Sequence, residues 1–382
     1  MTTSVRTRRI DADSHFLPHV DAGALKEVLP DWSPAKLDML ARDAAVFSDP
    51  AARRGGFRAS AAGQALNAGQ AGNVPAPARA GAVGHGDVEE RAGLIGVTGF
   101  DMQVLIPDGI FANPFGSPVA RRWDDGLRLA LCRAYNNASA AAEEARPDVF
   151  IGTAVVPFQD VEESCAEARR AAALGLRAIT INGNWGGQNW DTTELYPFWE
   201  TVADLGLILY VHHNPFACQV SDHIPTTWTI GWERMRRLHI SNYLGFAFEY
   251  MVGMASLTLG GLLQEFPDLR FCFFEAGGSW LPWAMYTLDR VYGVEPQCAR
   301  CTVAPSELIK RSCFVAVEPD EEPLVHAIAA IGSENFIIGS DYPHPPSTYP
   351  NTASGIEEMA GLSERDKENI LGRNVGALFG IG

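Results

Sequence analysis

Eight short apolar segments recur along the chain, and segments with helical periodicity separate them. The expected strands are Ile10–Asp13, Met102–Ile106, Phe150–Val156, Ala178–Ile181, Leu207–His212, Arg270–Glu275, Cys313–Val317 and Phe336–Gly339. Most of these segments are apolar on both faces, which is typical of strands in a buried parallel sheet. Strands that alternate with helices predict an α/β fold, and eight such strands are the number that closes a (β/α)8 TIM barrel.

Helical patterns fill the intervals between these strands. The expected helices include Arg121–Arg146, Val161–Ala173, Tyr196–Leu205, Met251–Glu265 and Glu321–Ile331. An open, doubly wound sheet is the alternative fold, but no glycine-rich phosphate loop follows the first strand to support it. The length of 382 residues suits one barrel with insertions. We therefore expect a single barrel domain over residues 1–382.

One segment, residues 44–85, departs from the alternation of strand and helix. It is crowded with Ala, Gly, Arg and Pro, and it follows the first strand. In a barrel this position places it near the active-site end, and loops of this length are usually lids or linkers. We expect either a lid over the site or an insertion without a role in catalysis.

Composition limits the partners that such a chain can bind. The formal net charge of −16 argues against nucleic acid and anionic membranes as partners. Seven scattered cysteines suit a reducing cytoplasm better than a disulfide framework. The most apolar stretch, Tyr250–Leu263, is too short to span a bilayer, and no apolar run of a signal peptide follows Arg8 and Arg9. These features predict a cytoplasmic protein that acts on a small molecule.

Metal-binding residue types cluster where the strands end. Active-site groups of barrel enzymes lie at the C-terminal ends of strands. Asp13 and His15 are two residues apart on the first strand, so both can face the barrel axis and bind one cation. His212 ends the fifth strand and Asp341 follows the eighth, which completes a mixed nitrogen and oxygen ligand set. Zn²⁺ or Mn²⁺ takes such ligands, so the sequence predicts one divalent metal ion.

Sequence motifs that run through most of the chain resemble a known family. They are Ile10-Asp11-Ala12-Asp13-Ser14-His15, Val156-Pro157-Phe158-Gln159-Asp160, Leu209-Tyr210-Val211-His212, Phe266-Pro267-Asp268-Leu269-Arg270 and Gly339-Ser340-Asp341-Tyr342-Pro343-His344. This ordered set resembles the amidohydrolase-2 family, the branch of the amidohydrolase superfamily that contains aminocarboxymuconate semialdehyde decarboxylase and γ-resorcylate decarboxylase. The resemblance implies a metal-dependent barrel enzyme that forms a homodimer or a higher homo-oligomer.

Two positions depart from the pattern of that family. The first motif is commonly His-x-His or Glu-x-His in the family, whereas Asp13 and His15 occupy it here. A carboxylate and an imidazole remain, so metal binding is expected to survive. On the sixth strand, many members place a catalytic His before a glycine pair, and this chain has Glu275 there. A glutamate can act as a base or a ligand but cannot donate as an imidazolium does.

The resemblance implies a metal-dependent carboxy-lyase that acts on an aromatic or unsaturated carboxylic acid. In this hypothesis Asp341 delivers a proton to the carbon that bears the carboxylate, and Glu275 positions or relays that proton. His344, just past Asp341, and Trp280, after the sixth strand, are candidate substrate contacts; packing would explain His344 equally well, and core packing is the default explanation for Trp280. The alternatives are a hydrolase of an amide, ester or lactone that uses a metal-activated water, and a non-catalytic binding protein.

Overall fold

In the computed structural model, the chain folds into one barrel. It describes residues 6–38 except Val20, together with Ala41, 84–108, Phe111, 125–158, 160–185, 187–212, Ile230, Met235, 240–344 and 347–381. The strands in these ranges are β1 (Ile10–Phe16), β2 (Met102–Pro107), β3 (Phe150–Gly152), β4 (Ala154–Val155), β5 (Ala178–Ile181), β6 (Ile208–Val211), β7 (Arg270–Phe273), β8 (Cys313–Val317) and β9 (Phe336–Ile338). Each of the eight predicted strands is present, and the third is divided into β3 and β4.

Every neighbouring pair of strands is parallel. β1, β2 and β3 form one ladder, and β4 to β9 form a second ladder in chain order. Thr153 alone separates β3 from β4, so these two short strands occupy one barrel position. A bridge between Ser14 and Tyr342 brings the end of β9 back to β1. The strands therefore close into the eight-position barrel that the sequence predicts.

The barrel interior is filled by side chains from alternate strand positions. They are Ile10, Ala12, Met102, Val104, Ile106, Ile151, Ala178, Ile208, Tyr210, Cys272, Phe274, Ala316 and Ile337. Val375 and Phe379, from the last helix, join this cluster at the N-terminal end of the strands. The interior is thus a packed core, and the opposite end, where the strands finish, is left for polar groups. We call that end the mouth.

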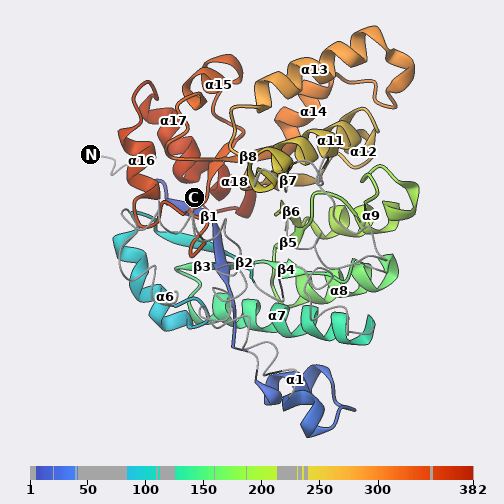
Figure 1. Cartoon of the computed structure of the whole chain (residues 1–382), viewed down its shortest axis with the longest axis vertical. Helices are drawn as coiled ribbons and strands as arrows, with labels where there is room; N and C mark the ends of the chain where they lie inside the picture. The colour runs from blue at the N-terminus through green and yellow to red at the C-terminus, as the bar shows by residue number, and fades with distance from the viewer. Residues whose placement is uncertain are drawn as a thin grey trace.

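Helices surround the strands in chain order, as Figure 1 shows. The longer ones are α7 (Asp125–Ala145), α8 (Val161–Ala173), α9 (Tyr196–Leu205), α11 (Phe246–Thr258), α13 (Leu281–Val294), α14 (Pro305–Ser312) and α15 (Leu324–Ile331). Shorter ones are α1 (Ala22–Val28), α6 (Val88–Leu94), α12 (Leu262–Glu265), α16 (Thr352–Glu358), α17 (Glu364–Glu368) and α18 (Asn374–Phe379). α8 and α9 have the predicted bounds, and α15 begins three residues later than expected.

One predicted helix is wrong in its extent. The expected Met251–Glu265 helix is two helices, α11 and α12, and α11 already begins at Phe246. The break falls at Gly260 and Gly261, and Gly261 has a φ of 87°. A left-handed residue of this kind ends a helix, and glycine adopts it without steric cost. The apolar pattern continued through the break and therefore hid it.

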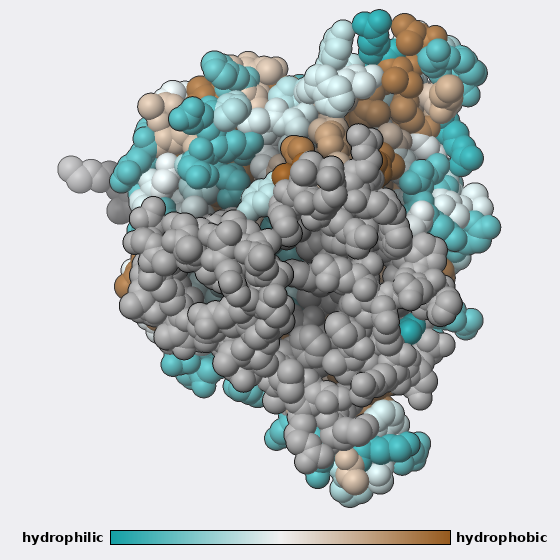
Figure 2. All heavy atoms as spheres, in the orientation of Figure 1, coloured by the Kyte–Doolittle hydropathy of each residue, from teal (hydrophilic) through white to brown (hydrophobic). Residues whose placement is uncertain are grey.

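The outer surface carries large apolar side chains on α13. Trp283 and Tyr286 are exposed, as is Val294 at the end of this helix. Figure 2 shows hydrophobic residues gathered over α13 at the upper right of the molecule. No helix among the described residues is long and apolar enough to cross a membrane.

Candidate active site

An extra residue in β1 turns two predicted metal ligands toward the barrel axis. The register pairs Asp11 with Gln103 and Ser14 with Leu105. Three steps along β1 thus match two along β2, and such a bulge shifts the side-chain alternation by one position. Asp13 lies within the bulge and His15 lies beyond it, and both reach the mouth, whereas Ser14 between them contacts Arg91 of α6 on the outside.

The end of β9 lies directly against Asp13. The backbone N–H groups of Ser340 and Asp341 donate to the Asp13 carbonyl at 3.2 and 3.0 Å. A Cβ on Gly339 would come within 2.2 Å of the Asp13 Cβ, so only glycine allows this approach. Asp341 has a φ of 52°, and its Oδ1 lies 3.1 Å from His15 Nε2. The strand end therefore places a third predicted ligand beside the first two.

His212 and Glu275 complete the group from the opposite side of the barrel. His212 follows β6 directly, and its Nε2 lies 3.8 Å from Asp13 Oδ2. Glu275 follows β7 with a φ of 61°, which breaks the strand alternation after the inward-facing Phe274. Its Oε1 lies 3.4 Å from His212 Nε2. The left-handed backbone thus brings in a side chain that regular alternation would turn outward.

These side chains form two overlapping groups that have the geometry to hold a metal ion. The first contains Asp13, His15, His212 and Glu275, and the second contains His15, Glu275, Asp341 and His344. Within each group, the donor atoms all lie within 4.8 Å of one another. All four predicted ligands are therefore brought to one place, with Asp341 in the second group and with Glu275 shared by both.

Three buried atoms in this place have no hydrogen-bond partner within the part of the chain that the structure describes. They are Asp13 Oδ1, His15 Nε2 and His212 Nε2. Buried polar atoms are nearly always paired, so each exception needs an explanation. The His15 Nδ1 lies 3.2 Å from the Pro107 carbonyl. Because a carbonyl only accepts, Nδ1 carries the proton and Nε2 presents its lone pair to the site. This donor set fits a divalent cation.

Burial and charge set the protonation of the two histidines in opposite directions. Burial, with the neighbouring His344 and His212, holds the pKa of His15 well below its ordinary value. Burial also acts to lower the pKa of His212, but Glu275, Asp13 and Asp341 outweigh it and raise that pKa to about 9. Burial raises the pKa of Asp13 well above its ordinary value. His15 is thus ready as a neutral ligand, whereas His212 must release a proton to bind a cation.

His344 links the site to Asp108, which sequence reasoning missed. The His344 Nδ1 lies 3.0 Å from Asp341 Oδ1, and its Nε2 lies 3.3 Å from Asp108 Oδ2. The His85 Nε2 lies 2.7 Å from the same Asp108 oxygen. Burial alone would lower the pKa of His344, but the carboxylates of Asp108 and Asp341 raise it well above its ordinary value. The rings of His344 and His15 are 3.9 Å apart, so His344 belongs to the site.

Strand alternation could have found three polar residues that the sequence analysis left out. Each stands two positions beyond an inward-facing residue: Asp108 after Ile106, Asn182 after Thr180, and Glu318 after Ala316. Two positions along a strand restore the same face, so all three are expected at the mouth. Enclosure by the protein and the charges of Asp341 and Glu275 raise the pKa of Glu318 to about 8, although its side chain reaches solvent.

A buried polar network supports β1 from outside the barrel. Asp11 accepts hydrogen bonds from the Ser340 N–H at 2.8 Å, the Ser340 hydroxyl at 2.7 Å and the Gln103 amide at 3.1 Å. The Arg91 guanidinium donates to the Gln103 amide oxygen at 3.1 Å and to the His15 carbonyl. The network thus joins the backbone of His15 to the residue before Asp341.

Trp280 and the 44–85 segment are less closely tied to the site. The Trp280 indole donates to the Gly277 carbonyl at 2.7 Å, and the ring packs against the core between strands and helices. Its role as a substrate contact stays a prediction.

Residues 44–83 lie outside the described residues. At the end of that segment, the His85 carbonyl accepts from the Leu17 N–H at 2.9 Å, beside the end of β1.

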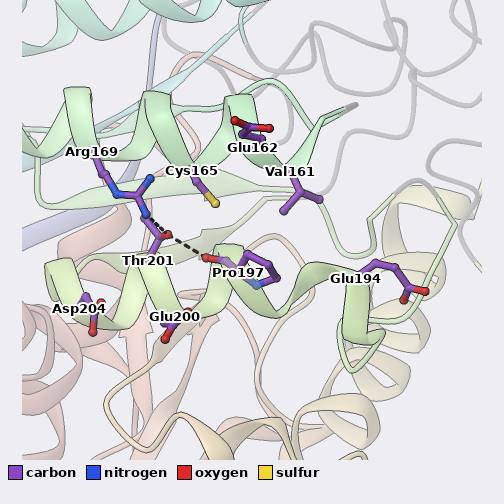
Figure 3. A pocket seen from close by; sticks show the side chains of 9 residues that line it. All are labelled: Val161, Glu162, Cys165, Arg169, Glu194, Pro197, Glu200, Thr201 and Asp204. Atoms are coloured by element: carbon purple, nitrogen blue, oxygen red, sulfur yellow. Dashed lines mark hydrogen bonds between the residues drawn. The ribbon is translucent and has the colours of Figure 1, made fainter.

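A separate cleft of about 420 Å³ lies between α8 and α9. Its lining residues are Val161, Glu162, Cys165, Arg169, Glu194, Pro197, Glu200, Thr201 and Asp204, and Figure 3 shows them on the helical layer. Arg169 donates to the Thr201 hydroxyl at 3.0 Å across it. None of these residues comes from the mouth, so the cleft is distinct from the candidate site.

The barrel and the polar groups at its mouth define an enzyme whose active site lies at the C-terminal ends of the strands. The family model described as "Amidohydrolase" matches residues 10–381, and the chain therefore belongs to the amidohydrolase family. A 2-amino-3-carboxymuconate-6-semialdehyde decarboxylase of Dictyostelium discoideum is 30% identical over 285 residues, covering 74% of this chain and 73% of the relative. The predicted resemblance is confirmed.

Two further proteins are similar to the chain. A γ-resorcylate decarboxylase of Rhodococcus jostii (strain RHA1) is 26% identical over 274 residues, covering 66% of this chain and 77% of the relative. A crystal structure of 5-carboxyvanillate decarboxylase from Novosphingobium aromaticivorans, with manganese and 4-hydroxy-3-methoxy-5-nitrobenzoic acid, has a TM-score of 0.68. That likeness covers 100% of both chains at 20% identity and therefore supports the fold.

Proposed function

We propose that this chain is a metal-dependent, non-oxidative decarboxylase of an aromatic or unsaturated carboxylic acid. The observation that carries the proposal is the convergence of Asp13 Oδ1, His15 Nε2 and His212 Nε2, three buried atoms that have no hydrogen-bond partner among the described residues. The relatives named as decarboxylases support the choice of reaction. The substrate itself is a small carboxylic acid in this proposal.

Asp13, His15, His212 and Asp341 would hold one divalent ion, Zn²⁺ or Mn²⁺. Glu275 lies close enough to His15 and His212 to share in this role. A cation bound there supplies a Lewis acid for the substrate's carboxylate and an adjacent hydroxyl. The manganese of the 5-carboxyvanillate decarboxylase structure supports a metal of this kind.

Asp341 is the proposed proton donor, as the sequence analysis expects. It gives its proton to the carbon that bears the carboxylate, the bond from that carbon to the carboxyl group breaks, and carbon dioxide leaves. The electron pair of that bond stays on the ring, so the proton replaces carbon dioxide without an oxidant. His344, 3.0 Å from Asp341, is placed to return a proton to it. Glu275 orients His212 through their 3.4 Å contact and serves as the proposed second acid–base group.

Product analysis tests the reaction. Protein reconstituted with Mn²⁺ or Zn²⁺ is incubated in deuterated water with 2,6-dihydroxybenzoate, 5-carboxyvanillate and related acids. Decarboxylation releases carbon dioxide and leaves deuterium where the carboxylate was. Incorporation of ¹⁸O from labelled water into products of the corresponding amides or esters, without release of carbon dioxide, would establish the hydrolase alternative instead.

Assembly and location belong to the same proposal. We propose a homodimer or a higher homo-oligomer, and the exposed Trp283 and Tyr286 of α13 offer an apolar surface for it. Cytoplasmic location is supported by the described cysteines, which are free thiols. One domain over residues 1–382, with a lid or a role-free insertion at 44–85, also remains our proposal. Sedimentation of the wild-type protein and of Trp283→Lys tests the assembly.

A further inference from the structure

Asn182 occupies an inner position of the mouth next to His212. It directly follows β5, whose Ile181 pairs with Val211 of β6, and the His212 N–H donates to the Ile181 carbonyl at 2.9 Å. Ala178 packs in the barrel interior, four positions before Asn182. Alternation therefore turns the Asn182 side chain inward, on the strand beside the proposed ligand.

The amide oxygen of Asn182 is buried and has no hydrogen-bond partner in the described ranges of the chain. The residue is only 5% exposed. Asn184, two residues on, is equally buried but fully engaged: its amide donates to Glu249 at 2.8 Å, and its oxygen accepts from the Gly187 N–H at 2.8 Å. A buried acceptor without a donor is rare and needs an explanation, and a donor on a bound ligand would supply one at this position.

The neighbouring side chains limit what that ligand can be. Phe274 follows β7 and stacks against the His212 ring, with centroids 6.4 Å apart. Asn182, His212 and Phe274 thus follow three consecutive strands, β5, β6 and β7. The amide oxygen only accepts, so the ligand must donate to it. Adjacent strands are about 4.8 Å apart, which places this donor close to the group bound at His212.

We propose that Asn182 Oδ1 accepts a hydrogen bond from a hydroxyl or amino group of the substrate, at a position next to the carboxylate. The inference deepens the proposed function and rests on it. It narrows the substrate class to carboxylic acids with a donor on the side of the ring that faces β5. Asn182 is then a residue that determines substrate specificity.

Two acids that differ only in this donor test the inference. 2,6-Dihydroxybenzoate offers hydroxyl groups on both sides of its carboxylate, and 2-hydroxy-6-methoxybenzoate offers one. Dissociation constants are measured by calorimetry on manganese-loaded protein, and kcat and KM are measured for release of carbon dioxide. Wild-type protein should prefer the dihydroxy acid by roughly 10-fold, the value of one neutral hydrogen bond. Asn182→Ala should reduce this preference to less than about 2-fold.

Asn184→Ala is the matched control, because it removes an equally buried amide that already has protein partners. It should keep the preference of the wild-type protein. Asn182→Leu, which fills the space, replaces Asn182→Ala if that variant does not fold. A wild-type protein that binds neither acid, or binds both equally, overturns the proposal, as does a preference that survives in the Asn182 variants. Binding that follows the expected pattern without carbon dioxide would reject the decarboxylase reaction while keeping the role of Asn182.

Discussion

Glu275 and Asp341 adopt the same left-handed backbone conformation at the ends of two different strands. Their φ values are 61° and 52°, and within the described ranges no other non-glycine residue has a positive φ. Both carboxylates come within reach of His15 and His344. A left-handed residue with a Cβ costs about 1–2 kcal/mol, and such strain persists where the surrounding structure imposes it. Here the strained conformation directs both carboxylates into the mouth.

Replacing Asp341 by glycine and by alanine should separate the energetic cost of its left-handed backbone conformation from the contribution of its carboxylate to activity. Both variants lose the carboxylate and should lose activity. Asp341→Gly should be more stable than Asp341→Ala by about 1 kcal/mol, because glycine adopts a φ of 52° without a clash. Urea unfolding of the metal-free proteins measures the difference. Equal stability would mean that the conformation is not strained.

His212→Ala should remove most of the bound metal while the fold is kept, because a ligand at a strand end contributes little to the core. Wild-type protein should carry about one divalent ion per chain, measured by mass spectrometry after dialysis. His326→Ala, an exposed histidine on α15, is the control and should keep the ion. Full metal retention in His212→Ala would remove this residue from the ligand set.

The stability of the metal-free protein should fall as the pH rises from about 6.5 to 9. The pKa of His212 is raised to about 9 in the folded state, so the folded protein binds more protons than the unfolded chain in this window. The stabilisation that protonated His212 gives the folded state is complete below the ordinary histidine pKa of about 6.5 and is lost as the pH rises through 9. This stabilisation amounts to at most about 3 kcal/mol. The raised pKa of His344 acts in the same direction. Unfolding in chelator at several pH values measures the slope, which should be smaller in His212→Asn.

Added metal should reverse this trend, because a cation competes with the proton on His212. The increase in melting temperature caused by Mn²⁺ should therefore grow with pH over the same window. A metal effect that is constant with pH would show that His212 releases no proton on binding.

Glu275→Gln keeps the size of the side chain but removes its acid–base function. If Glu275 moves protons, kcat should fall by roughly 10²–10⁴-fold. Metal content should stay unchanged, because Asp13, His15, His212 and Asp341 remain. Turnover at the wild-type rate would show that Glu275 has a structural role, with Asp341 as the proton carrier.

Arg91→Met should weaken metal binding by roughly 10-fold, because it removes the hydrogen bond from the Arg91 guanidinium to the His15 carbonyl, which holds the backbone of a proposed ligand in place. A loss of stability alone could lower the apparent affinity, so the control is Asn335→Ala. The Asn335 amide donates to the carbonyls of Lys310 and Cys313, at the end of the barrel opposite the mouth. Titration with Mn²⁺ at a temperature where both variants are folded compares them. Similar losses of affinity would assign Arg91 to general stability.

The fold, and the gathering of the four predicted ligands at one mouth, followed from local rules. The expected strands are apolar segments of four to seven residues, so the position where each strand ends can be read from the sequence. The C-terminal ends of parallel strands in a barrel all lie at the mouth. The direction of Glu275 could not be predicted in this way, because it depends on a left-handed residue that regular alternation does not contain. The pairing of Asp108 with His344 could not be predicted either, since it joins β2 to the residues after β9 across the closed barrel. The helix break at Gly260 and Gly261 was readable in the sequence, but the apolar pattern masked it.

The bulge in β1 makes the pairing register of this strand matter as much as the identity of its residues. A β1 of the same sequence that continued its regular pairing with β2 beyond Asp11 would match Ser14 with Ile106 and would exchange the two faces of the strand from there on. Ser14 would then face the mouth, and Asp13 and His15 would face α6. A point substitution changes one side chain, whereas loss of the bulge would turn two proposed ligands out of the mouth at once. The irregular pairing of β1 with β2 is therefore as much a part of the candidate site as the side chains that it directs there.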